Sequence, residues 1–189
     1  ANTYTGATTV SAGTLVVAVT HASAVAVGNG GTLIHPGSIT GNVTIQSGGL
    51  DAPSASPSLR SITGSFSLNS GGILRVRLDG STAGTQHDQL IVSGTVTLGG
   101  ALDVIAGPAL APGSTFRILD KAGSTTTATT FTGKAENSTF VNADGYTFRI
   151  NYNSGTGNDI VLTLITSPIE QWRYTNYGEP GMDCSTRPL

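Results

Sequence analysis

Two acidic and two basic residues are the best candidates for chemistry in this 189-residue chain. Asp79 and Asp88 flank a polar loop, and Arg75 and Arg77 alternate along the strand predicted before it. Polysaccharide lyases and hydrolases use carboxylates that converge with a cation on one face. The structural alternative is that Asp88 caps a turn and the arginines line a solvated face. We favour it, because the sequence shows no cleft lined by acids.

Metal chemistry has one candidate segment, residues 155–161. Its order Gly-Thr-Gly-Asn-Asp-Ile-Val resembles one copy of a calcium-binding nonapeptide, in which Asp and backbone carbonyls hold the ion between adjacent turns. Such sites need tandem copies. A single copy therefore predicts a tight turn between strands, with Asn158 or Gly157 at positive φ.

The histidines are weaker candidates still, because their positions lack the spacing of metal ligands. We expect them at surface or corner positions; they are His21, His35 and His87. No catalytic, cofactor-binding or metal-binding residue is therefore expected. The single cysteine, Cys184, has no partner for an internal disulfide.

Charge narrows the possible partners. Only 11% of the residues are charged, the formal net charge is -2, and residues 1–50 contain no Asp, Glu, Lys or Arg. Nucleic-acid binding is excluded because it needs clustered Lys and Arg. No apolar run reaches the roughly 18 residues of a membrane span. A surface with so little charge offers weak repulsion between copies, which favours association.

The elements that position the candidate acids and arginines belong to a repeated sequence unit. Alternating apolar residues and Thr or Ser lead into Gly and then Leu five times, in residues 8–15, 26–33, 43–50, 66–74 and 96–102. A strand, a glycine corner and a strand that return every ~20 residues predict stacked β coils. The spacing of Leu15, Leu33 and Leu50 sets the predicted length of one coil. The expected fold is all-β, a β-solenoid of stacked coils.

The coils are expected to change along the chain. We predict a solenoid domain over residues 1–166, with a loop at 51–58 because Pro53 and Pro57 lack the N–H that a central strand donates. The aromatic-rich part from about 107 to 166 predicts a less regular capping half. Its predicted strands lie at 115–119, 140–141, 146–150 and 160–164, with another around Phe131. The alternative for this half is an antiparallel β-sandwich.

Residues 167–189 are predicted to form a separate tail. Residues 169–178 begin with helix formers and predict one or two helical turns that end near Gly178. Trp172 is expected either to anchor this tail on the solenoid, which we favour, or to contact a partner.

Three segments carry a resemblance to a known family. Residues 2–15, with the order Asn-Thr-Tyr-Thr-Gly-Ala-Thr-Thr-Val-Ser-Ala-Gly-Thr-Leu, resemble the autotransporter-associated β-strand repeat of bacterial surface and secreted passenger proteins. Residues 87–102 and 155–163 resemble the C-terminal part of the same passengers. The resemblance implies a right-handed parallel β-helix outside the cell, used as a stalk or adhesin, and it implies no catalytic residues. Residues 167–178 are similar to a C-terminal segment of secreted repeat proteins from Verrucomicrobia-like bacteria.

The expected function is therefore structural: a non-enzymatic, secreted or cell-surface protein that associates end to end as a fibre, stalk or surface-layer subunit. An uncapped coil exposes backbone groups that pair with another chain, and a head-to-tail contact propagates into a filament. The residues expected at such contacts are Tyr4, Val10, Leu15, Trp172, Tyr174 and Tyr177. The alternatives are an adhesin that binds a surface glycan through Thr and Asn ladders, and a polysaccharide lyase or hydrolase.

Overall fold

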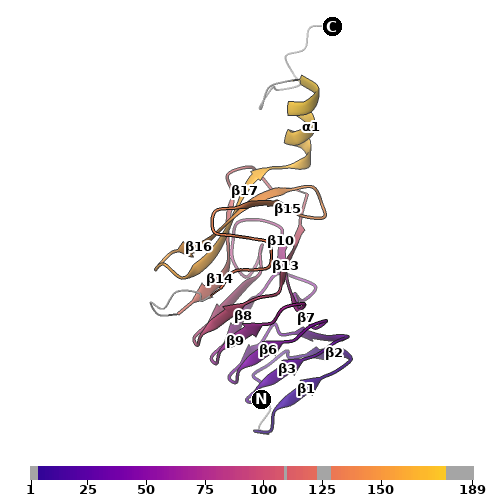
Figure 1. Cartoon of the computed structure of the whole chain (residues 1–189), viewed down its shortest axis with the longest axis vertical. Coiled ribbons are helices and arrows are strands. Elements are labelled where there is room, and N and C mark those ends of the chain that lie inside the picture. Colours follow the sequence, from indigo (N-terminus) through magenta and orange to yellow (C-terminus); the bar gives the residue numbers. More distant parts are fainter. Residues whose placement is uncertain (1–3, 109, 123–128, 178–189) are drawn as a thin grey trace.

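The computed structural model describes residues 4–108, 110–122 and 129–177. These residues form an all-β structure of three sheets, followed by one helix (Figure 1). The first sheet has the parallel order β1 (Thr8–Val10), β3 (Val25–Val27), β6 (Val43–Ile45), β9 (Phe66–Leu68) and β12 (Val96–Leu98). The second is also parallel, with the order β2 (Gly13–Val16), β4 (Gly31–Ile34), β7 (Leu50–Ala52), β10 (Ile73–Leu78) and β13 (Ala101–Ala106).

The third sheet is mixed. Its parallel part has the order β5 (Ser38–Ile39), β8 (Leu59–Ile62), β11 (Gln89–Val92) and β14 (Thr115–Lys121). It continues antiparallel through β17 (Asp159–Thr166), β16 (Thr147–Ser154) and β15 (Thr139–Val141). None of the sheets closes on itself within the described residues. The strands stack along the long axis of the molecule, with β1 and the helix α1 (Pro168–Tyr177) at opposite ends (Figure 1).

The five sequence repeats are confirmed as the stacked units. Each repeat is one strand of the first sheet, a corner and one strand of the second sheet, in the pairs β1–β2, β3–β4, β6–β7, β9–β10 and β12–β13. After the second, third and fourth repeats the chain enters the third sheet, as β5, β8 and β11, before it returns to the first. After the fifth repeat it enters the third sheet as β14, and the strands that follow also belong to that sheet. We call each repeat, together with the third-sheet strand that follows it, a coil. Coil 1 contains β1 and β2, coil 2 contains β3 to β5, and coil 3 contains β6 to β8.

The predicted register of the second sheet is wrong by one residue. Leu15 pairs with Leu33, but Leu33 pairs with Asp51, and Asp51 pairs with Leu74. Leu50, which the repeat pattern placed in this column, lies beside it on the strand, partly exposed. The loop predicted at 51–58 is also shorter than expected. Strand β7 includes Asp51 and Ala52, so the loop begins at Pro53.

Glycine determines the corner between the first two sheets. Gly13, Gly30, Gly48 and Gly71 have φ between 73° and 80°, the left-handed region that other residues rarely occupy. They form a hydrogen-bonded ladder, in which the N–H of each donates to the carbonyl of the next at 2.8–3.2 Å. The repeated glycine in the sequence is thus the residue that lets each corner stack on the one below.

The antiparallel strands predicted for the C-terminal half are present, but they do not form a sandwich of their own. β15, β16 and β17 extend the third sheet, so this half shares a sheet with the parallel coils. The predicted strands at 115–119, 140–141, 146–150 and 160–164 are confirmed. Phe131 is an exception, because it lies in a loop yet is only 1% exposed. Its N–H donates to the hydroxyl of Tyr152, which holds this loop over the core.

The predicted helix is confirmed as α1. Ser167 caps it, since the Ser167 hydroxyl accepts from the N–H of Glu170, and Pro168 occupies the first helical position. Trp172, which we favoured as the anchor of this tail, is 57% exposed, and α1 projects beyond the sheets (Figure 1). The side chains of Tyr174 and Tyr177, and all of Cys184, lie outside the described residues.

Candidate functional site

The largest group of buried charges lies where the second sheet turns toward the third. Asp51 is on β7, Arg60 is on β8, and His35 follows β4. All three side chains are completely buried. The Arg60 guanidinium donates to Asp51 Oδ1 at 2.7 Å, and His35 Nε2 lies 3.4 Å from the same oxygen. This cluster joins coils 2 and 3 inside the core.

The cluster keeps Asp51 ionised. Burial by itself would raise the pKa of Asp51, but the adjacent Arg60 and His35 lower it below its ordinary value. Asp51 occupies a position in the column that Leu33 and Leu74 fill in the neighbouring coils. Sequence reasoning missed this residue, although repeating the step from Leu15 to Leu33 leads directly to it. Because the cluster is sealed from solvent, no substrate can reach it.

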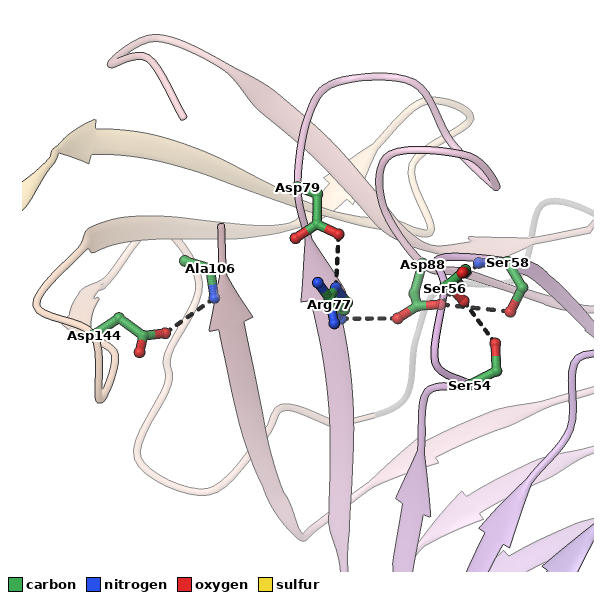
Figure 2. Close-up of polar contacts among 8 residues, drawn as sticks. All are labelled: Ser54, Ser56, Ser58, Arg77, Asp79, Asp88, Ala106 and Asp144. Carbon is green, nitrogen blue, oxygen red and sulfur yellow. Dashed lines mark hydrogen bonds and ion pairs between the residues drawn. The ribbon is translucent and has the colours of Figure 1, made fainter. Parts of the chain in front are cut away.

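Asp88 lies just before β11 and contacts both a loop and a strand, as Figure 2 shows. Its carboxylate accepts from the N–H of Ser58 at 3.0 Å and from the N–H of Arg77 at 2.8 Å. The predicted role as a turn cap is therefore replaced by a bridge between the loop after β7 and strand β10. Burial raises the pKa of Asp88, while Arg60 and the two backbone donors act in the opposite direction.

The arginines beside this bridge line a solvated face, as the structural interpretation predicts. Arg77 donates to Asp79 at 2.6 Å (Figure 2), and Arg75 donates to Asp103 at 2.7 Å. Both guanidinium side chains are about 40% exposed. Asp79 contacts the guanidinium of Arg77 and Asp88 contacts its backbone N–H, while Arg75 pairs with Asp103, so the four residues are not combined in one catalytic arrangement.

The three histidines were expected at surface or corner positions, and burial excludes the surface alternative. They are 0–3% exposed: His21, His35 and His87. The Nε2 atom of the His21 ring lies 3.0 Å from the Ser23 hydroxyl. The backbone of His21 forms a β-bridge with Ile39 of the third sheet. Each histidine therefore fills a corner of the core.

The segment 155–161 forms the tight turn that its sequence predicts, between β16 and β17. Gly155 and Gly157 have φ of 61° and 94°. Asp159 is buried, and its carboxylate accepts from the N–H of Lys121 at 3.0 Å, so it links β17 to β14. Within the described ranges, no three His, Cys, Asp or Glu side chains group closely enough to hold a metal ion.

The two ends of the coil stack differ. At the C-terminal end, the chain covers its own last coil. The N–H of Ala106 on β13 donates to Asp144 at 3.0 Å (Figure 2), and Asn142 donates to the carbonyl of Val104. On β12, the N–H of Leu98 donates to the Thr129 hydroxyl at 2.5 Å. Backbone groups that an edge strand would otherwise expose are thereby used internally.

At the N-terminal end, β1 pairs with β3 and β2 pairs with β4, and the described residues place no strand on their other sides. Val16, Val19 and Tyr4 are 50–61% exposed here. Of the contact residues predicted for assembly, Tyr4 is accessible, whereas Val10 is buried and Leu15 packs against the core. Sequence reasoning missed Val16 and Val19, because the strand pattern does not say which apolar side chains face outward at an end.

No described helix is long and apolar enough to cross a membrane. No protein-family model matches the chain, and no curated protein is similar to it.

Proposed function

We propose that this protein is a non-enzymatic structural module, secreted or displayed on the cell surface, that associates through the edges of β1 and β2. In this proposal the five coils form a right-handed parallel β-helix of the kind implied by the resemblance to autotransporter-associated repeats. Right-handedness is supported by a general rule, since parallel strands of one sheet are joined by right-handed connections in about 98% of cases. The observation that carries the proposal is the contrast between the two ends.

The non-enzymatic role is supported by how the acids are used. Every Asp or Glu in the described part of the chain before α1 has a structural partner. Asp51, Asp79, Asp103 and Asp120 pair with arginines. The others accept from backbone N–H groups, at 2.6–3.0 Å; these are Asp88, Glu136, Asp144 and Asp159. Acid and base catalysis needs carboxylates that are free to exchange protons with a substrate.

Association through β1 and β2 is supported by three observations: among the described residues no strand pairs with their outer edges, Val16 and Val19 are exposed, and charge is low. In parallel ladders, alternate N–H groups point to opposite sides; Val17 donates toward β4, so the N–H of Val16 points to the open side. A head-to-tail filament would also need an open C-terminal end, which residues 129–146 cover. The structure therefore favours contact between two N-terminal ends, which closes after two copies.

The test compares two exposed valines at opposite ends. Val16→Lys places a charge on the open edge, where lysine blocks strand pairing. Val141→Lys is the matched control, because Val141 is 65% exposed on β15 at the other end. Light scattering after size-exclusion chromatography should show a concentration-dependent dimer for the wild type and the control. The dimer should weaken at least about tenfold in Val16→Lys. A wild-type monomer at all concentrations, or loss of the dimer only in Val141→Lys, would contradict the proposal.

A further inference from the structure

A pocket of about 390 Å³ lies on the outer side of the third sheet, beneath the loop between β10 and β11. The loop contributes Ser81 and Ala83, and the sheet contributes Gln89, Thr115, Arg117 and Val161. The sheet residues come from three neighbouring strands, β11, β14 and β17. The pocket shares no residue with the N-terminal end, so the inference below is independent of the proposed association.

Hydrogen bonds within the loop hold the pocket wall in place. The ring of His87, which also lines the pocket, contacts the carbonyl of Gly80 through Nδ1 at 3.1 Å. The same ring packs edge-on against Phe116, with 5.6 Å between the centroids. The side chain of Gln86 accepts from the N–H of Thr82 at 3.1 Å. Because this wall is already ordered, a ligand would not have to pay for ordering it.

The lining groups match a ligand rich in hydroxyls. Ser81 and Thr115 have hydroxyls that donate and accept, Gln89 has an amide that does both, and Arg117 only donates. Ala83 and Val161 add apolar surface, which suits the C–H groups of a sugar ring. A pocket of this size is at the small end of the range of about 300–1,000 Å³ for small-molecule sites. That volume suits one or two sugar rings.

Charge in the pocket argues for a neutral ligand. Arg117 Nη1 lies 3.1 Å from Asp120 Oδ2 and 3.6 Å from Asp159 Oδ2. One guanidinium therefore faces two carboxylates, and its positive charge is already offset. An acidic sugar would therefore gain little from Arg117, whereas a neutral sugar would still find the uncharged hydrogen-bonding groups. We propose that this pocket binds a neutral mono- or disaccharide unit of a surface glycan.

The test measures sugar binding by titration calorimetry and saturation-transfer NMR. The neutral probes are N-acetylglucosamine and cellobiose, and the acidic probe is glucuronate. Thr115→Val removes one hydroxyl at constant shape. Thr97→Val is the matched control, because Thr97 is an exposed strand residue on the first sheet. We expect a neutral probe to bind, Thr115→Val to weaken binding about fivefold, and Thr97→Val to bind like the wild type.

Three outcomes would overturn the inference. These are no binding of either neutral probe up to its solubility limit, binding of glucuronate alone with loss in Arg117→Gln, or binding that Thr115→Val leaves unchanged. Circular dichroism and thermal melts of each variant separate a change in binding from a loss of fold. Because Thr115 and Thr97 are both exposed, neither substitution removes a core contact.

Discussion

At the scale of single residues, the buried pair of Asp51 and Arg60 is the largest departure from an apolar core. A buried ion pair seldom stabilises a fold relative to an apolar pair of the same shape, but a buried charge without its partner is very costly. We therefore interpret the pair as a determinant of which coils and side chains contact each other at this corner. Its net contribution to the free energy of unfolding is expected to be small.

Removing one partner should reveal this cost. Arg60→Met leaves Asp51 buried without its cation, and we expect the free energy of unfolding to fall by about 3–5 kcal/mol. The double variant Asp51→Leu with Arg60→Met should recover much of that loss, because leucine already occupies the neighbouring positions at Leu33 and Leu74. Urea denaturation measures both. A double variant less stable than Arg60→Met alone would show that the pair contributes more than charge compensation.

His87 should make stability depend on pH. Burial lowers the pKa of His87 from its ordinary value of 6.5. Below about pH 6.5 the unfolded chain therefore binds a proton that the folded chain resists, so stability present above this pH is lost as the pH falls. Urea denaturation between pH 7.5 and 5.5 should show a smaller decrease for His87→Gln than for the wild type. Equal slopes would rule out this contribution.

Two carboxylates also make stability depend on pH. The lowered pKa of Asp51 means that its stabilising effect is lost only as the pH falls below the ordinary value of 3.8. Asp88 has a raised pKa, so its contribution changes in the opposite direction, decreasing as the pH rises through that raised value. Both carboxylates are present in the wild type and in His87→Gln, so their contributions cancel when the two proteins are compared in the same buffers.

At the scale of the elements, the glycine ladder decides how corners stack. Gly13 and Gly48 have nearly the same φ, 73° and 74°, but different surroundings. A Cβ on Gly13 would meet nothing within 4 Å, whereas one on Gly48 would lie 2.2 Å from Asn29 Oδ1. The two positions thus separate the cost of the backbone conformation from the cost of the close approach.

We expect Gly13→Ala to destabilise the protein by about 1–2 kcal/mol, the cost of the left-handed conformation alone. Gly48→Ala should cost more, because the Asn29 side chain must also move. Thermal unfolding followed by circular dichroism compares the two variants directly. A Gly48→Ala variant as stable as Gly13→Ala would mean that Asn29 relocates without loss.

At the scale of the whole molecule, the difference between the ends is what distinguishes a dimer from a fibre. The coils have the same construction throughout, but residues 129–146 cover β12 and β13 at one end only. An assembly through N-terminal ends should therefore reach a molar mass of two chains and stop. Continued growth with concentration would mean that the covering segments leave the last coil.

The sequence alone was enough to predict the repeating architecture. Alternation of Val, Ile and Leu with Thr, followed by glycine, is a local pattern, and the conformations that it requires are local too. That is why the five repeats, the loop after β10, the turn at 155–161 and the helix α1 were all predicted. The alternation of Arg75 and Arg77 also predicted a strand before the polar loop, and Leu74, Val76 and Leu78 on the other face of that strand are buried.

Only the tertiary structure decided the exact register, the buried charges and the two ends. Register is a relation between strands far apart in the chain, and a shift of one residue placed Asp51 instead of Leu50 in the core column. The partners of Asp51 and Asp88, and the segments that cover β12 and β13, come from other coils or from distant loops. Such contacts depend on how the coils stack, and a local sequence pattern carries no information about them.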